Sequence, residues 1–250
     1  MKAVVVGASS GLGRSIGIGL GQRGHQVALL ARRLDRIEEA AAEAGPGSVA
    51  ITCDVTDSAS CEEAIAGAAE ALGGIDAVVY ASGIGPLGRI AEVDRESWLR
   101  TFDTNVVGAS IVTAAALPHL EASQGAVAYL SSTSASLTPP WPGLGAYAVS
   151  KAALDKLVEA WRNEHPHVGF TRITVGECGG GEGASGSEFP TEWDGDLAIE
   201  VAPIWMERNY MSGSLLDVEE LISVVDRVLS CGATAVIPSV AVIPRIVTGG

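Results

Sequence analysis

The sequence predicts an α/β fold, a doubly wound parallel sheet flanked by helices on both faces. Two observations lead to this prediction. Short apolar runs alternate with longer helical patterns along the chain, which is the order expected when crossover helices join the strands of a parallel sheet. A glycine cluster, Gly7-Ala8-Ser9-Ser10-Gly11-Leu12-Gly13, directly follows the first apolar run, where such a sheet needs a tight strand-to-helix turn.

The individual elements follow from this alternation. We expect strands at residues 3–6, 26–31, 48–52, 76–80, 126–131, 170–175 and 234–237. Helices fit between them, at roughly 12–23, 34–44, 58–72, 95–121, 145–164 and 217–230. Residues 179–196 are rich in Gly, Glu and Ser and poor in apolar side chains, so they bury too little surface to order themselves strongly. We expect a mobile loop there, beside the functional site.

Length and composition indicate a single domain over residues 1–250. One doubly wound core is routine at this length, and the 47% of hydrophobic residues suffice to fill it. The longest mostly apolar stretch, residues 106–117, is too short to span a bilayer, so we expect no membrane segment. Lys2 leads directly into an apolar strand, which leaves no room for a signal peptide. These features predict a cytoplasmic protein.

The charge and the cysteines exclude several classes of function. A formal net charge of −14 argues against nucleic acid as a partner, because binding it requires a basic face. An anionic cofactor can still bind where backbone amides at a helix N-terminus and a few arginines outweigh the global field. The four cysteines show no metal-ligand spacing, so we expect free thiols and no metal site; they are Cys53, Cys61, Cys178 and Cys231.

Tyr147 and Lys151 are the most informative pair in the sequence. Their spacing of four places the phenol and the ammonium on one face of a helix. A phenol with its ordinary pKa near ~10 is a poor proton donor or acceptor at neutral pH, and a cation beside it favours the phenolate. The pair therefore indicates acid–base chemistry at a carbonyl or an alcohol, although the same spacing also occurs on ordinary amphipathic helices.

Together with the glycine turn and Asn105, this pair resembles the single-domain short-chain dehydrogenase/reductase family along nearly the whole chain. The resemblance implies a Rossmann-type sheet and an NAD(P)-dependent enzyme. It implies that Tyr147 is the general acid for reduction and the general base for oxidation, while Lys151 binds the nicotinamide ribose and depresses the pKa of the phenol. It assigns to Asn105 a backbone geometry that helps to hold a water linked to the lysine.

The family's catalytic serine, which orients and polarises the substrate oxygen, has two candidates here. Ser132 stands in the family's usual place at the end of a strand but lies fifteen residues before Tyr147, whereas Ser134 has the usual spacing of thirteen. We favour Ser132, because the strand fixes its register while the proline-rich segment 138–142 can absorb two extra residues as loop.

The cofactor site follows from the same resemblance. Gly7, Gly11 and Gly13 match the family's Gly-x-x-x-Gly-x-Gly, which brings backbone amides and a helix dipole to a pyrophosphate. Asp54 and Val55 resemble the pair that contacts the adenine. The full set of predicted cofactor-binding residues is Gly7, Ser9, Ser10, Gly11, Leu12, Gly13, Arg32, Arg33, Asp54, Val55, Ala81, Ser82, Gly83, Tyr147, Lys151 and Gly179.

The end of the second strand indicates which form of the cofactor binds. Ala31 stands where an NAD-selective enzyme places a carboxylate for the ribose hydroxyls. Arg32 can grip a 2′-phosphate through paired donors, and Arg33 or Arg14 adds charge. We therefore expect NADP, with NADPH preferred over NADH. One of the two adjacent arginines is expected only to begin a solvated helix face.

Two segments depart from the family pattern. Tyr80-Ala81-Ser82-Gly83 replaces Asn-Asn-Ala-Gly, and Cys178-Gly179 replaces Pro-Gly, with no threonine before Thr191. They keep open an alternative function, a catalytically silent nucleotide-binding sensor with the same fold. The main prediction is an oxidoreductase for a small neutral carbonyl or secondary alcohol, a homodimer or homotetramer assembled through its fourth and fifth helices. Four large side chains beyond the loop are candidates for either a pocket wall or core packing: Trp193, Trp205, Met206 and Tyr210.

Overall fold

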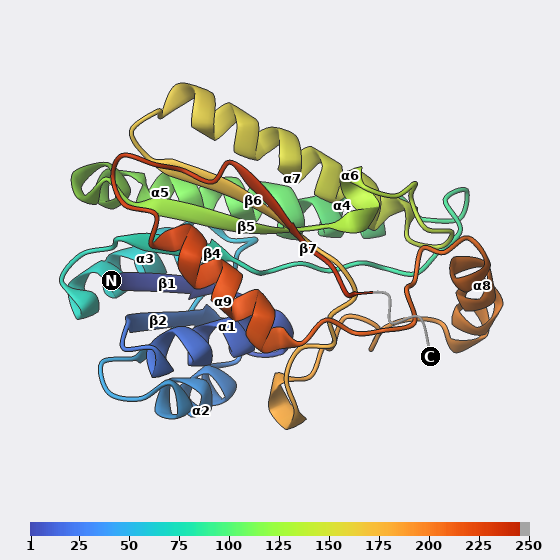
Figure 1. Cartoon of the computed structure of the whole chain (residues 1–250), viewed down its shortest axis with the longest axis horizontal. Coiled ribbons are helices and arrows are strands. Elements are labelled where there is room, and N and C mark those ends of the chain that lie inside the picture. Colours follow the sequence, from blue (N-terminus) through green and yellow to red (C-terminus); the bar gives the residue numbers. More distant parts are fainter. Residues whose placement is uncertain (246–250) are drawn as a thin grey trace.

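Residues 1–245, which the computed structural model describes, form a seven-stranded parallel sheet between two layers of helices (Figure 1). The strands lie in the order β3-β2-β1-β4-β5-β6-β7, and every neighbouring pair is parallel. The chain therefore builds the sheet outward from β1 in one direction and from β4 in the other. The strands are β1 (Lys2–Val6), β2 (Gln26–Ala31), β3 (Val49–Thr52), β4 (Ala77–Tyr80), β5 (Ala126–Ser132), β6 (Gly169–Val175) and β7 (Ser239–Val242).

Alternate residues of each strand face opposite helical layers, as the pleat requires. On β1, Val4 and Val6 pack in a core with α3, α5 and α7, whereas Ala3 and Val5 pack with α1, α2 and α9. Figure 1 shows α7 at the top of the view, α1 and α2 at the bottom, and α9 in front of the central strands. These helices are α1 (Gly11–Gln22), α2 (Leu34–Ala44), α3 (Ser58–Leu72), α5 (Gly108–Ser123), α7 (Gly145–Glu164) and α9 (Val218–Leu229). The predicted fold class is confirmed.

The boundaries of the first six strands and of the six helices just named match the sequence prediction closely, except that α5 begins within the helix expected at 95–121. The prediction for the seventh strand is wrong, because β7 lies at Ser239–Val242 and not at 234–237. Apolar runs stand on both sides of Pro238, and the local pattern does not distinguish them. Pairing with β6 decides between them, since Arg172 aligns with Ser239.

The helix expected at 95–121 is one helical run in three parts. A π-helical turn, η1 (Asp103–Val107), separates α4 (Arg95–Phe102) from α5. Among the residues described, Arg95–Ser123 is the one helix long and apolar enough to cross a membrane by length and composition. The core helix of a globular fold passes the same test, and α5 buries Val112, Ala116 and Leu120 in the core it shares with α3. Packing within the fold therefore accounts for these three side chains of α5.

Three further helices surround the carboxyl ends of the strands. They are α6 (Thr133–Ser136), the 3₁₀ helix η2 (Gly183–Ser185) and α8 (Gly195–Glu207). The sequence analysis predicts none of them. The first turn of α8 is capped by Asp194, whose carboxylate accepts from the Leu197 amide at 2.8 Å. Figure 1 shows α8 at the right edge of the molecule, beyond the carboxyl ends of the strands.

Candidate functional site

The turn after β1 brings the N-terminus of α1 to the carboxyl edge of the sheet, beside the point where the strand order changes direction. Open α/β sheets bind ligands at this place. Gly7 and Gly11 have φ angles of +87° and +56°, in the left-handed region that glycine enters most easily. A Cβ on Gly13 would lie 2.2 Å from the Gly7 carbonyl oxygen. Only glycines therefore allow the helix to begin so close to the strand.

This turn fits the pyrophosphate of a dinucleotide. Ser10 is the N-cap of α1, but its hydroxyl does not cap the helix, so amides of the first turn are open to an outside acceptor. The Gly11 amide donates to the Gly186 carbonyl at 3.1 Å. The hydroxyls of Ser9 and Ser10 line the same turn, and Leu12 anchors it by packing on the core.

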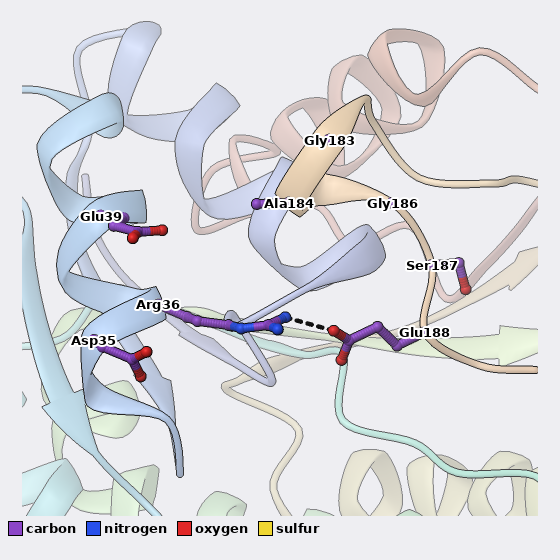
Figure 2. A pocket seen from close by; sticks show the side chains of 8 residues that line it. All are labelled: Asp35, Arg36, Glu39, Gly183, Ala184, Gly186, Ser187 and Glu188. Atoms are coloured by element: carbon purple, nitrogen blue, oxygen red, sulfur yellow. Dashed lines mark hydrogen bonds and ion pairs between the residues drawn. The ribbon is translucent and has the colours of Figure 1, made fainter. Parts of the chain in front are cut away.

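Arg33 lies over the glycine turn. Its guanidinium donates to the Ser9 hydroxyl at 2.8 Å and to the Ser10 hydroxyl at 3.2 Å, and it pairs with Glu188 at 2.8 Å. Arg36, which follows on α2, pairs with the same carboxylate (Figure 2). The two arginines form an anion site beside the turn and fit a phosphate group.

Arg32 and Arg14, the other two arginines predicted to bind the cofactor phosphate, lie outside this anion site. Arg32 is exposed, and its charge acts on Asp54. The pKa of Asp54 is lowered, chiefly by a hydrogen bond from the Thr56 amide and also by the charge of Arg32. Arg14 is 1% exposed and bonds to the Arg36 carbonyl and to Glu43. It joins α1 to α2 through its two terminal nitrogens, while its Nε is buried without a partner.

The turn after β4 is held by a bond that the family pattern does not contain. The Tyr80 hydroxyl donates to the Thr104 carbonyl at 2.5 Å and so ties the strand to η1. Val55 is buried close by, and its carbonyl oxygen lies 2.7 Å from where a Cβ on Gly108 would stand. The Tyr80 side chain thus supplies a connection in place of the absent asparagines.

Ala81, Ser82 and Gly83 connect the glycine turn to the lysine. The Ala81 amide donates to the last carbonyl of β1 at 2.9 Å. A Cβ on Gly7 would lie 2.6 Å from the Ser82 amide nitrogen, and one on Gly83 would lie 3.2 Å from Lys151 Nζ. The predicted residues from the first and fourth strands therefore meet at one edge of the sheet.

Tyr147 and Lys151 lie on one face of α7, as their spacing predicts. Lys151 is 4% exposed, and its ammonium donates to the Leu130 carbonyl of β5 at 2.8 Å. The same nitrogen lies 5.9 Å from the centre of the Tyr147 ring. The phenol and the buried cation are thus close neighbours at the end of β5.

Burial dominates the ionisation of this pair. It raises the pKa of Tyr147 to about 12, and the Ser132 hydroxyl acts in the opposite direction. It lowers the pKa of Lys151 to about 8, against the attraction of Asp155. The sequence analysis expects the lysine to depress the pKa of the phenol, but in this arrangement desolvation outweighs that effect. Part of the cover is Phe189, whose ring centre lies 4.9 Å from that of Tyr147.

Ser132 lies beside the phenol, at the end of β5 and at the N-cap of α6. Its Oγ accepts from the Ser134 amide at 3.3 Å and lies 3.0 Å from the Ser134 hydroxyl. Ser134 is 4% exposed. The structure therefore brings Ser132 to Tyr147, and Ser134 supports it from the following turn.

Asn105 is fully buried in the π-helical turn η1 and joins two parts of the site. Its side chain accepts from the Ile84 amide at 2.9 Å and donates to the Ile84 carbonyl at 2.8 Å. It also donates to Ser150 Oγ at 2.8 Å, and Ser150 in turn donates to the Tyr147 carbonyl. The turn after β4 is thereby fixed to the helix that carries Tyr147 and Lys151.

The segment after β6 begins with the two residues that replace Pro-Gly. Cys178 packs half-buried on the core, and burial raises the pKa of its thiol, so the thiol is protonated at neutral pH. The Gly179 carbonyl accepts from the Ser187 amide at 2.8 Å. Gly179 thus anchors the segment that runs across the glycine turn.

An aromatic cluster stands next to Tyr147. Trp193 packs edge-on against Phe189 and against Trp205, and its ring nitrogen donates to the Gly85 carbonyl at 2.8 Å. Tyr210 stacks on Trp141, which also contacts Trp205. Met206 is 49% exposed. Trp193, Trp205 and Tyr210 thus form an apolar wall beside the site, and Met206 lies at the surface.

Sequence reasoning missed Arg36, Glu188 and Phe189. Arg36 carries a detectable signal, because it stands three residues after Arg33 at the start of a helix that the sequence predicts. Glu188 and Phe189 lie in the segment expected to be a mobile loop, and no local pattern marks them. Their positions follow only from contacts with distant parts of the chain.

Comparison with known proteins identifies the relatives of this chain. Residues 1–185 match the family model described as short chain dehydrogenase. The chain is 35% identical over 181 residues to glycine betaine reductase ATRR of Emericella nidulans, covering 71% of this chain and 14% of that protein. It is 33% identical over 179 residues to 11-beta-hydroxysteroid dehydrogenase A of Sesamum indicum, covering 69% of this chain and 51% of that protein. The alignments thus span a small part of the first relative and about half of the second.

Solved structures share the fold over almost the full length. A short-chain type dehydrogenase/reductase from Mycobacterium marinum superposes with a TM-score of 0.82 at 24% identity, covering 99% of this chain and 95% of that one. An alcohol dehydrogenase from Thermococcus sibiricus, complexed with 5-hydroxy-NADP, superposes with a TM-score of 0.80 at 24% identity, covering 96% and 94%.

Proposed function

Because the chain belongs to the short-chain dehydrogenase/reductase family, we propose that it is an NADP-dependent oxidoreductase for a small neutral carbonyl or secondary alcohol. Membership makes it an oxidoreductase of a family that uses NAD(P). One observation carries the rest of the proposal: Tyr147 lies beside both the Ser132 hydroxyl and the buried Lys151 ammonium, which is 5.9 Å from its ring centre.

Each of these side chains has a distinct role in the proposal. A bound nicotinamide dinucleotide supplies or accepts the hydride. Tyr147 gives its phenolic proton to the substrate oxygen in reduction and takes it back in oxidation, while Ser132 donates a hydrogen bond to that oxygen. Lys151 would hold the ribose hydroxyls of a bound cofactor, and its ammonium would favour the phenolate on approaching the phenol. Asn105 keeps the turn after β4 in register with the helix that carries both residues.

The anion site of Arg33 and Arg36 supports NADP as the cofactor. Ala31 offers no carboxylate to the ribose hydroxyls, and Arg33 lies against the hydroxyls of the glycine turn. We therefore assign the main contact with the 2′-phosphate to Arg33, with Arg36 second, in place of Arg32, which the sequence analysis favours. Arg32 remains available to the adenine end, since its charge acts on Asp54.

Fluorescence titration with NADPH and NADH tests this assignment. Because one charge-assisted contact to phosphate contributes roughly 1.5–3 kcal/mol, Arg33→Ala should weaken NADPH binding by about ten- to a hundredfold and should not weaken NADH binding. Arg32→Ala is the matched control and should change the NADPH affinity much less. Equal affinities of the native chain for the two cofactors would contradict the proposed preference.

A turnover assay distinguishes an oxidoreductase from a catalytically silent nucleotide-binding sensor. NADPH is mixed with the protein and a panel of neutral aldehydes and ketones, and the loss of nicotinamide absorbance is recorded. The proposal expects turnover of at least one carbonyl. Tight NADPH binding without turnover on any of them would favour the catalytically silent sensor.

The apolar side chains next to Tyr147 and the negative net charge of the protein support a neutral, partly apolar substrate. Trp193, Trp205 and Leu144 pack into the cluster that adjoins Tyr147, and the net charge of −14 repels strongly anionic molecules. A cytoplasmic location and assembly into a homodimer or homotetramer complete the proposal. The exposed apolar side chains of α4, η1 and α7 favour that assembly: Leu99, Val107 and Val149.

A further inference from the structure

Residues 180–189, which we term the plug segment, form a compact hairpin over the glycine turn. A bridge joins Gly180 to Gly186, and the Gly181 amide donates to the Ser185 carbonyl at 2.9 Å. The 3₁₀ helix η2 forms its tip. The segment makes three contacts that fall on three successive parts of the predicted cofactor site.

The first contact involves the glycine turn. The Gly11 amide donates to the Gly186 carbonyl, and a Cβ on Gly180 would lie only 3.3 Å from Gly11 Cα. This amide belongs to the N-terminus of α1, the group that a pyrophosphate needs. An N–H group has a single proton, so Gly186 and a pyrophosphate oxygen compete for it.

The second contact involves the anion site. The Glu188 carboxylate pairs with Arg33. It also pairs with Arg36, as Figure 2 shows. These ion pairs lower the pKa of Glu188 to about 2, so the side chain carries its charge throughout the neutral range. A carboxylate and a 2′-phosphate seek the same guanidinium donors.

The third contact involves the reaction centre. The Phe189 ring packs edge-on against Tyr147 with a centroid distance of 4.9 Å. A Cβ on Gly85 would lie 2.3 Å from Phe189 Cζ, so the glycine makes room for this ring. An apolar ring therefore covers the phenol that the substrate and the nicotinamide must reach.

Besides these three contacts, the plug segment is held by the packing of Phe189 on Trp193 and by the bond from the Ser187 amide to the Gly179 carbonyl. A cavity of about 490 Å³ opens between it and α2, lined by Asp35, Arg36, Glu39, Gly183, Ala184, Gly186, Ser187 and Glu188 (Figure 2). Loosely packed segments of this kind open at low free-energy cost. The segment can thus leave the cleft while the sheet and its helices stay in place.

We propose that the plug segment is an internal ligand of the cofactor cleft, in which the Gly186 carbonyl, the Glu188 carboxylate and the Phe189 ring stand in for the pyrophosphate, the 2′-phosphate and the nicotinamide. The proposal rests on the proposed function, since it assumes that a dinucleotide uses this cleft. Binding then requires the segment to swing out, and the fraction of open molecules scales the apparent affinity. This is the reverse of a loop that is mobile without ligand and orders over substrate.

Glu188→Gln tests the proposal, because it keeps the side-chain shape and removes the competing charge. Weakening two partly exposed ion pairs should raise the affinity for NADPH and for NADH by the same factor, roughly three- to tenfold. Glu192→Gln is the matched control: Glu192 pairs with Arg100 at 3.0 Å, next to the plug segment. Calorimetric titration of both variants and the native chain gives the two dissociation constants.

The possible results separate the two proposals. Tighter binding of both cofactors by Glu188→Gln alone supports the internal ligand. Unchanged or weaker binding overturns it while the proposed function stands, and weaker binding would make Glu188 a direct cofactor contact. Tighter binding of only one cofactor also overturns it, because displacement of the whole segment must help both. Failure of every variant to bind either dinucleotide would overturn the proposed function together with the internal ligand.

An engineered disulfide between the plug segment and α1 provides a second test, because it can be formed and reduced while NADPH binding is measured. A Cβ on Gly181 would lie 3.2 Å from Ser15 Oγ, a separation close to that between a Cβ and the far sulfur of a disulfide. The double variant Ser15→Cys, Gly181→Cys should lose NADPH binding when oxidised and recover it on reduction. Equal affinity in the oxidised and reduced forms, with the cross-link verified by mass, would overturn the proposal.

Discussion

At the scale of single residues, the site combines a buried cation with a phenol whose proton is held tightly. Burial raises the pKa of Tyr147 to about 12 and lowers that of Lys151 to about 8. Each shift disfavours the charged form of its own group. The phenol therefore stays neutral at neutral pH, and Lys151 carries a desolvation cost.

Tyr147→Phe should abolish turnover and preserve cofactor binding, because it removes the proton donor and keeps the ring. Losing general acid catalysis reduces rates by roughly 10²- to 10⁴-fold. Lys151→Ala should impair both turnover and NADPH affinity, since that ammonium is assigned to the ribose as well. Steady-state kinetics and NADPH titration distinguish the two defects. Near-native turnover by the Tyr147→Phe variant would show that Tyr147 is not the proton donor.

Lys151→Met should stabilise the fold at neutral pH. The pKa of Lys151 falls from its usual 10.5 to about 8 on folding, so at pH 7 the folded state bears the whole cost of a buried charge, and unfolding relieves it. After allowing for the lost bond to Leu130, we expect the free energy of unfolding to rise by about 1–3 kcal/mol. The cost of the lysine declines as pH rises from about 8 to 10.5, so the difference should fade over that window.

Urea unfolding at pH 7 and pH 10 measures this effect. Lys156→Met is the matched control, since the Lys156 side chain on the same helix is 79% exposed. It should leave stability nearly unchanged at both pH values. A Lys151→Met protein less stable than the native chain at pH 7 would show that the buried ammonium is well compensated in the fold.

At the scale of elements, the site depends on how β4, η1 and α7 are joined. The Tyr80 hydroxyl fixes β4 to the Thr104 carbonyl, and Asn105 fixes the following turn to α7 through Ser150. Both bonds meet at the π-helical turn, a feature that often marks functional sites. The connection therefore links Tyr80 to the position of α7, the helix that carries Tyr147 and Lys151.

Tyr80→Phe should reduce turnover as well as stability. It leaves the Thr104 carbonyl without its partner, which costs about 1–3 kcal/mol, and it loosens the turn that holds Asn105. Tyr129→Phe is a close control, because Tyr129 pairs with Tyr80 across the sheet and its hydroxyl lies 2.7 Å from Thr113 Oγ1. Both variants should lose similar stability in urea, but only Tyr80→Phe should lower kcat. Equal kcat in the two would disprove a link between Tyr80 and the site.

At the scale of the whole molecule, the helical layers leave apolar side chains at the surface. Val107 and Val149 are 46% and 45% exposed on η1 and α7, two elements that pack against each other. Exposed apolar positions clustered on neighbouring elements favour association of like subunits. The proposed association would use this face, because the net charge of −14 disfavours contact between like subunits elsewhere.

Val149→Asp should therefore reduce the molecular mass in solution from that of an oligomer to that of a monomer. Introducing a carboxylate into an apolar interface leaves it unpaired and desolvated in the assembly. Leu137→Asp, at a residue 56% exposed outside these helices, is the control and should leave the mass unchanged. Light scattering after size exclusion measures both, and a native chain that is already monomeric would contradict the proposed assembly.

The sequence by itself determined the order of strands and helices, the glycine turn and the face shared by Tyr147 and Lys151, because local spacing and apolar periodicity encode these features. The tertiary structure decided the rest. It selected Arg33 over Arg32 for the anion site and Ser239–Val242 over residues 234–237 for the last strand. It also placed Glu188 beside Arg33 and Arg36 and Phe189 beside Tyr147. Each of these outcomes depends on partners far away in the chain, and no local pattern records which distant groups will meet.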